Sequence, residues 1–114
     1  MSKLNNFKIK IETGSQGMDS PVKFNVNGFS IAFENGQGSV GPGGTFEASY
    51  EINSFPHSLT LVGPEKGVWG IKKIAVEYQC EDLEPYSALF GEVTLDEKTE
   101  VNIWKEPPLP SFDV

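Results

Sequence analysis

The stretch Val68–Tyr78 constrains the fold of this chain more than any other, because it is the longest run with the pattern of a strand. Its apolar residues recur at every second position up to Ile71, the alternation slips by one residue at Lys72–Lys73, and it resumes at Ile74. Such a slip is typical of a strand with a β-bulge, which re-aims side chains and adds twist. A helix is less favourable here, since it would have to accommodate Gly70 and several β-branched residues.

Two segments nearer the N-terminus also alternate. Phe7–Glu12 places apolar and charged residues on opposite faces, which predicts a half-buried strand. Val22–Phe33 predicts a β-hairpin around Asn27-Gly28, because both central residues of such a turn need a positive φ angle. That turn sets the apolar residues of the two arms opposite one another on one shared face. The expected pairs are Val26 with Phe29, Phe24 with Ile31, and Val22 with Phe33.

The other segments complete an all-β pattern. Phe46–Ile52 and Ser58–Val62 predict strands, and Ala88–Leu95 with Thr99–Trp104 predicts a final hairpin. The Gly-rich segment Glu34–Gly44 predicts a long flexible loop. About eight strands at this spacing, with many turn residues between them, predict an antiparallel β-sandwich.

The chain length of 114 residues suits one domain, so we expect residues 1–114 to form a single sandwich with extended tails at residues 1–5 and 105–114. The net charge of −7 argues against nucleic acid as a partner and against purely electrostatic binding to anionic lipid. Cys80 is the only cysteine, so no internal disulfide is expected. The sequence shows no signal peptide and no apolar run that spans a bilayer, which predicts a cytoplasmic protein or one exported by a non-classical route.

Few residues have the pattern of a catalytic or metal site. His57 is the only histidine, and no nucleophile–base motif accompanies it, so the sequence does not predict an enzyme. Calcium is the one ion that the composition permits, because it prefers carboxylate and carbonyl oxygens from loops. Asp19 is the leading candidate ligand, flanked by the carbonyls of Gly17 and Met18. Further candidates, if the loops converge at one end, are Glu65, Asn35 and Glu34.

Several short motifs resemble those of a known family. The start Phe7-Lys-Ile-Lys-Ile-Glu-Thr-Gly14 and the following Gly17-Met-Asp-Ser-Pro-Val22 resemble the opening of PLAT domains, also called lipoxygenase homology domains. Gly44-Thr-Phe46 and Leu59-Thr-Leu61 are similar to later strands of that family. Trp69-Gly-Ile71-Lys-Lys73-Ile74-Ala-Val76 is similar to its Trp-containing strand, including the one-residue slip. The chain departs from the family at Gly70, where a bulky residue is usual, and at Lys72, where an acid is usual.

The resemblance implies a sandwich of two four-stranded sheets and a non-catalytic module that docks on membrane lipid or on a partner protein. In some members calcium binds in the end loops. Asp19 matches the Asp of the family's loop motif, and Trp69 matches its Trp. The resulting hypothesis is docking through the loop end that carries Met18, Asp19, Glu65 and Trp69, with calcium bridging the acidic loops to anionic lipid.

Two other kinds of function remain open. A carbohydrate-binding or adhesive sandwich would use exposed aromatic rings as a stacking platform, for which the candidates are Trp104, Tyr86 and Trp69. A structural or assembly subunit would bind another chain through its sheet edges or through the Pro-rich C-terminal tail. If Trp69 is buried it caps the core, and if it is exposed beside Asp19 it is an anchor.

Overall fold

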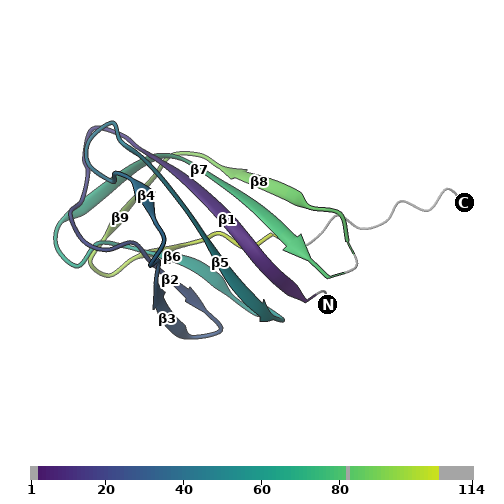
Figure 1. Cartoon of the computed structure of the whole chain (residues 1–114). Coiled ribbons are helices and arrows are strands. Elements are labelled where there is room, and N and C mark those ends of the chain that lie inside the picture. Colours follow the sequence, from purple (N-terminus) through teal and green to yellow (C-terminus); the bar gives the residue numbers. More distant parts are fainter. Residues whose placement is uncertain (1–2, 82, 106–114) are drawn as a thin grey trace, which may run out of the picture.

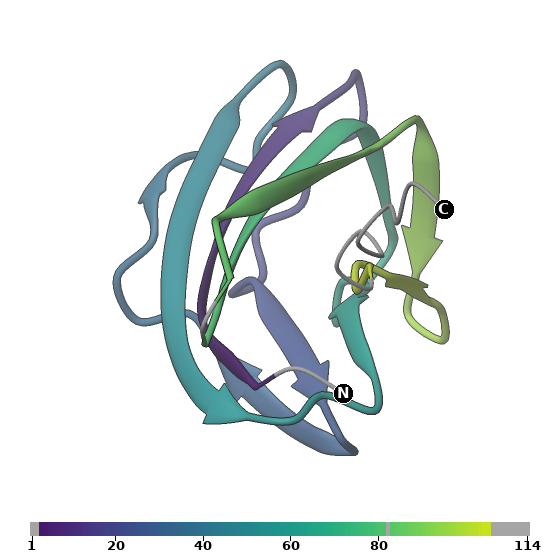
Figure 2. The ribbon, with the colours of Figure 1, turned by 90° about the vertical axis from the view of Figure 1, so that its right-hand side faces the viewer.

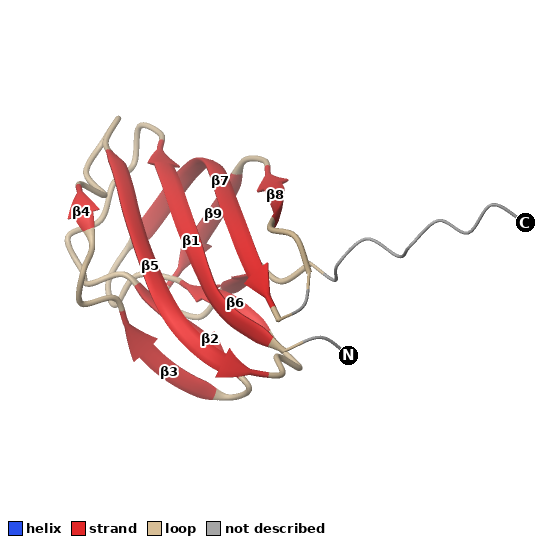
Figure 3. Cartoon of the chain, turned by 45° about the vertical axis from the view of Figure 1, so that its right-hand side comes forward, coloured by secondary structure: helices blue, strands red, loops and turns tan. Residues whose placement is uncertain are grey.

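The computed structural model describes residues 3–81 and 83–105, and within these ranges the chain forms strands and no helices (Figures 1 and 3). Accordingly, no described segment is a helix of the length and apolar character that crossing a bilayer requires. The strands are β1 Leu4–Thr13, β2 Lys23–Val26, β3 Phe29–Ala32, β4 Gln37–Gly38, β5 Thr45–Ser54, β6 Leu59–Val62, β7 Val68–Cys80, β8 Tyr86–Phe90, β9 Val93–Asp96 and β10 Glu100–Asn102.

The strands form two antiparallel sheets, which confirms the predicted β-sandwich. The large sheet has the order β4-β5-β1-β7-β8, with β9 also paired to β7, and the small sheet has the order β10-β6-β2-β3. Figure 2 shows the two curved sheets facing each other. The sheets therefore contain six and four strands rather than four each.

The irregularity predicted in Val68–Tyr78 is a β-bulge in β7. Glu12 pairs with Lys73 and Thr13 pairs with Ile71, so Lys72 has no opposite residue on β1. The extra residue restores the phase of the alternation. As a result, Ile71 before the bulge and Ile74 after it are both buried, while Lys72 and Lys73 are exposed.

The hairpin of β2 and β3 has the predicted register, with Val26 opposite Phe29 and Phe24 opposite Ile31. Asn27 and Gly28 have φ angles of 49° and 88°, as the tight turn requires. The two arms differ in burial, however. Phe24 is fully buried, whereas Phe29 is 71% exposed, because β3 is the outermost strand of the small sheet in the described part of the chain (Figure 3).

The end of the chain differs from the predicted final hairpin. Ala88–Leu95 is not one strand: it breaks into β8 and β9, which pair with successive halves of β7. Strand β10 then leaves the large sheet and pairs with β6 in the small sheet. Sequence alternation does not report which sheet a strand joins, so this crossover lay outside what the pattern could predict.

The core lies between the sheets and is rich in aromatic rings. The ring of Phe24 contacts Phe7 at 5.2 Å, Phe33 at 4.7 Å and Tyr50 at 5.1 Å between ring centroids. These contacts join the small sheet to β1 and β5 of the large sheet. Leu4 is fully buried in β1, so the first strand begins inside the predicted N-terminal tail of residues 1–5. Of the predicted C-terminal tail, residues 106–114 lie outside the described residues.

The sandwich has two long margins of different construction. At the margin that we call the closed edge, β9 of the large sheet runs into β10 of the small sheet through a tight turn, so the backbone itself joins the sheets. At the margin that we call the open edge, β3 of the small sheet faces β5 of the large sheet, and within residues 3–81 and 83–105 no strand connects them. Strand β4 covers only Phe46 and Glu47 of β5.

Candidate functional site

The loop predicted to bind calcium is held mainly by its backbone. The N–H of Met18 donates to the carbonyl of Val40 at 2.9 Å, and Asp19 is exposed. A Cβ added to Gly17 would lie 2.5 Å from the backbone of Gly41, so this position requires glycine for close packing of two loops. The role that the structure gives Gly17 is therefore steric.

Glu65 lies near this loop, but its carboxylate has another partner. The N–H of Glu65 donates to the Ser20 hydroxyl at 3.3 Å, which places Glu65 beside the residue that follows Asp19. The carboxylate of Glu65 accepts a hydrogen bond and salt bridge from Lys23 at 2.9 Å. Among the described residues, no group of three or more His, Cys, Asp or Glu side chains is placed to hold a metal ion. Calcium binding by Asp19 therefore stays a prediction.

The other calcium candidates lie elsewhere. Asn35 donates from Nδ2 to the Ser49 hydroxyl at 3.2 Å and accepts from the Ser49 N–H at 3.4 Å. Glu34 lines a cleft with Ser49 and Glu51 at the open edge. The segment of residues 34–44, which includes β4, thus contacts the Asp19 loop through Val40. Its residue Asn35 hydrogen-bonds Ser49 of β5, and Glu34 lines the cleft beside β5.

Trp69 is the clearest correction to the predicted contact surface. Its side chain is fully buried, and its indole N–H donates to the hydroxyl of Thr13 at 3.0 Å inside the core. The strand phase explains this placement, because the bulge at Lys72 keeps Trp69 on the same inward face as Ile74. Trp69 caps the core and does not anchor the protein to a membrane. Met18 is half-buried against the core edge.

The aromatic residues considered as a carbohydrate platform do not form an exposed surface. Besides the buried Trp69, Tyr86 and Trp104 pack against the buried ring of Tyr78 at centroid distances of 4.9 Å and 5.2 Å. The Tyr86 hydroxyl donates to the carbonyl of Lys105 at 2.7 Å. These rings hold the closed edge together.

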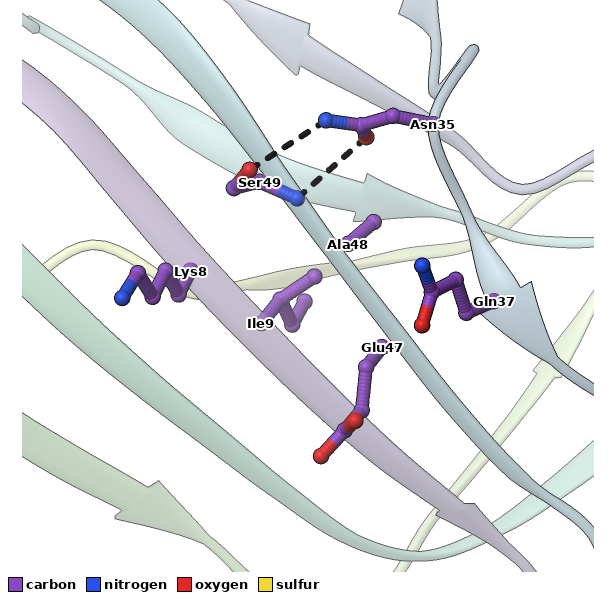
Figure 4. Close-up of a pocket in the computed structure, with 7 residues that line it drawn as sticks. All are labelled: Lys8, Ile9, Asn35, Gln37, Glu47, Ala48 and Ser49. Atoms are coloured by element: carbon purple, nitrogen blue, oxygen red, sulfur yellow. Dashed lines mark hydrogen bonds between the residues drawn. The ribbon is translucent and has the colours of Figure 1, made fainter.

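A shallow polar hollow of about 380 Å³ lies over β1 and β5 (Figure 4). Asn35 reaches across β5 to hydrogen-bond Ser49, while Lys8, Gln37 and Glu47 lie around the rim. The lining contains no histidine, cysteine or paired carboxylates. Its polar groups therefore offer neither a metal site nor the nucleophile and base of a catalytic pair.

Two exposed phenylalanines lie at the end of the sandwich that carries the hairpin turn. Phe29 is 71% exposed and follows the turn directly, and Phe55 is 48% exposed in the loop between β5 and β6. Asn27 joins the two segments. Its Nδ2 donates to the carbonyl of Phe55 at 3.0 Å, and its Oδ1 accepts from the N–H of His57 at 2.6 Å and of Ser58 at 3.2 Å. We call Asn27, Phe29 and Phe55 the aromatic end.

A cleft of about 220 Å³ continues from the aromatic end along the open edge. Apolar side chains of β3 and β5 dominate its walls. We call it the edge cleft, and it is lined by Val26, Asn27, Phe29, Ile31, Tyr50, Glu51, Ile52 and Ser54. A second cleft shares Tyr50 and Glu51 with it and adds Glu34. Neither lining contains a lysine or arginine, so the charged residues that line these two clefts are Glu34 and Glu51.

Sequence reasoning missed the aromatic end and the edge cleft. The available signal was Phe29 placed directly after Asn27-Gly28, together with Phe55 beside Pro56 in a loop. Alternation identified Phe29 as apolar-face, but whether that face is covered depends on the distance between the sheets at this margin.

No family model, curated protein or solved structure matches this chain in comparisons with known proteins.

Proposed function

We propose that this chain is a non-catalytic binding module that docks on a partner protein through the aromatic end. The observation that carries the proposal is the exposure of Phe29 and Phe55 on segments that Asn27 holds in place. Large rings on a fixed support lose little conformational freedom on binding, which is why aromatic residues are frequent in the cores of interfaces. The resemblance to PLAT domains supports a docking role of this kind.

The charge distribution favours a protein over an anionic membrane. The chain has a net charge of −7, and the cleft beside Phe29 carries Glu51 and no basic residue. Insertion into anionic lipid would bring these carboxylates toward phosphate groups. The calcium bridge that could offset this repulsion belongs to the Asp19 loop, where the carboxylate of Glu65 is paired with Lys23.

Site-specific photo-crosslinking tests the proposal. A benzophenone amino acid replaces Phe55 in the full chain, and a matched control replaces Leu89, which is 69% exposed on β8 at the other margin of the large sheet. In extract of the source cells, we expect a discrete protein adduct from position 55 and none from position 89. Excess unlabelled chain should suppress the adduct, and the double variant Phe29→Ser/Phe55→Ser should not. Equal adducts from both positions, or suppression by the double variant, would contradict the proposal.

Vesicle sedimentation separates lipid from protein as the partner. Vesicles of phosphatidylcholine alone or with phosphatidylserine are mixed with the chain in calcium or in chelator. We expect the chain to stay in the supernatant in every case. Sedimentation that the double variant Phe29→Ser/Phe55→Ser abolishes would replace the partner protein with a membrane surface.

A further inference from the structure

We propose that the free edge of β3 binds an extended, apolar segment of the partner protein, which adds as a further strand to the small sheet. The inference rests on the proposed function and specifies how the partner binds. It requires unpaired backbone groups on β3, an apolar surface beside that strand, and a charge distribution that favours one kind of partner.

The unpaired groups follow from the hairpin register. Residues that flank a two-residue turn exchange backbone hydrogen bonds, and bonded pairs recur at every second residue. Val26 and Phe29 are such a pair, and the N–H of Phe33 donates to the carbonyl of Val22 at 3.0 Å in the same phase. The backbone groups of Ser30 and Ala32 therefore point away from β2. Both residues are exposed at the outer margin of the small sheet.

The edge of β3 lacks most of the features that normally prevent strand addition. Free edges are commonly protected by very short strands, Lys, Pro, a bulge or an inward charge. Strand β3, with the sequence Phe-Ser-Ile-Ala, is short, but it contains no Pro or charged residue and pairs with β2 without a register shift. Its short length limits the number of new hydrogen bonds, so side chains must supply much of the affinity and selectivity.

The edge cleft supplies that side-chain surface. A strand added beside β3 directs alternate side chains to the same face as Phe29 and Ile31. On that face lie Tyr50 and Ile52 of β5, both half-buried. The apolar side chains of the added strand would cover these residues and the exposed ring of Phe29. The strand would thus close the margin that the chain itself leaves open.

Charge specifies the partner's chemistry. The margin carries Glu34 and Glu51 and no basic residue among its lining groups. A complementary segment alternates apolar residues with others and carries Lys or Arg at its ends. A second copy of this chain fits less well, because pairing two β3 edges would bring their carboxylates together.

Selection of peptides tests the inference without knowledge of the partner. The full chain is used to select from a phage-displayed library of random peptides about ten residues long, the usual upper length of a strand. We expect enrichment of alternating apolar sequences with Lys or Arg. Absence of enrichment, or enrichment of acidic peptides, would overturn the inference.

Backbone variants then test the mode of binding by fluorescence anisotropy with the selected peptides. Ser30→Pro removes an N–H that β2 does not use, and we expect it to weaken binding by about tenfold, the effect of losing one or two hydrogen bonds. Ser30→Ala keeps the N–H and should bind as the parent chain does. N-methylation of alternate peptide amides removes the hydrogen-bond donors of the added strand and should abolish binding. If the Ser30→Pro variant does not fold, Ala32→Pro takes its place.

The outcomes separate this inference from the proposed function. Peptides that lose affinity with Phe55→Ser but bind Ser30→Pro normally would leave the proposed function standing and overturn strand addition. A dimer in light scattering that Ser30→Pro dissociates would assign the β3 edge to a second copy and overturn the heterologous partner.

Discussion

The closed and open edges of the sandwich hold the two sheets together in different ways. At the closed edge the turn from β9 to β10 carries the chain from the large sheet to the small one. Backbone hydrogen bonds then hold β10 to β6 within the small sheet: the N–H of Gly63 donates to the carbonyl of Thr99 at 3.0 Å, and the N–H of Ile103 donates to the carbonyl of Leu59 at 2.9 Å. The hydroxyl of Tyr78 in β7 donates to the carbonyl of Ile103, which follows β10. At the open edge side chains make the main contacts between the sheets, through Phe33, Tyr50 and the amides of Asn27 and Asn35.

The difference indicates that the closed edge stabilises the fold and that the open edge is better suited to binding. Backbone hydrogen bonds and fully buried side chains make the closed edge a source of stability. The open edge leaves Phe29, Ile31 and Tyr50 partly uncovered and the outer groups of β3 unpaired. Regions with few buried contacts open at lower cost and are frequent sites of binding.

The first prediction compares matched truncations at the two edges. Ile103→Ala removes a fully buried side chain at the closed edge and should lower the free energy of unfolding by about 2–5 kcal/mol. Ile31→Ala, at the half-buried position of β3, should cost about 1 kcal/mol, because less apolar area returns to water. Urea denaturation measures both. Equal losses would show that the open edge is as tightly packed as the closed one.

The second prediction concerns the amide that holds the aromatic end. Asn27→Ala removes the side-chain hydrogen bonds to the segment of residues 55–58. The alanine would also have to adopt the φ angle of 49° without the support of those bonds. We expect a loss of about 1–3 kcal/mol in urea denaturation. Asn27→Gly, which tolerates the φ angle, isolates the hydrogen-bond part. Asn35→Ala should cost less than about 1 kcal/mol, since it removes two bonds to Ser49, against three at Asn27, and Asn35 does not have a positive φ angle. A larger loss for Asn35→Ala than for Asn27→Ala would reverse this order.

The third prediction is a pH dependence that belongs to the closed edge. Burial raises the pKa of Tyr78 well above its ordinary value of about 10. The folded state therefore keeps this proton at a pH where the unfolded state loses it. The contribution of Tyr78 to stability is full below about pH 10 and falls by about 1.4 kcal/mol per pH unit above it.

Urea denaturation of the parent chain and of Tyr78→Phe, between about pH 8 and pH 11, measures the contribution of Tyr78 to stability. We expect the difference in unfolding free energy between the two chains to be constant below about pH 10 and to move in favour of Tyr78→Phe above it. A difference that stays constant over the whole range would mean that Tyr78 is accessible to water and that the closed edge is looser than its hydrogen bonds indicate.

The fourth prediction concerns the loop of Asp19, which lies outside both edges. Calcium at about 1 mM should leave Tm unchanged, because the carboxylate of Glu65 is paired with Lys23 and only a ligand that binds the native state raises Tm. A rise in Tm that Asp19→Asn abolishes would establish the calcium site that the sequence suggested. The module would then have a second functional region away from the open edge.

Local patterns in the sequence predicted the strands well. The alternation of Phe7–Glu12, the turn at Asn27-Gly28 and the bulge beside Lys72 are encoded within a few residues, so no distant contact was needed to infer them. The predictions that were wrong concern strand pairings between segments far apart in the sequence. The break between β8 and β9 and the pairing of β10 with β6 depend on which strands lie beside them.

The candidate site shows the same limit. The N–H of Glu65 contacts Ser20, the residue after Asp19, whereas Met18 contacts Val40. The pairing of Glu65 with Lys23 was not visible in the sequence. The aromatic end was missed because exposure is a property of the assembled sheets.

The two-residue period of the sequence and its slip were enough to predict a β-sandwich with a bulged central strand, because they fix which side chains share a face. The burial of Trp69, the closure of one margin by β9 and β10, and the exposure of Phe29 beside β5 became visible once the strands were packed together. Alternation assigns a residue to a face, whereas burial depends on whether another strand covers that face. Among the described residues no strand lies beyond β3, and we propose the binding surface there.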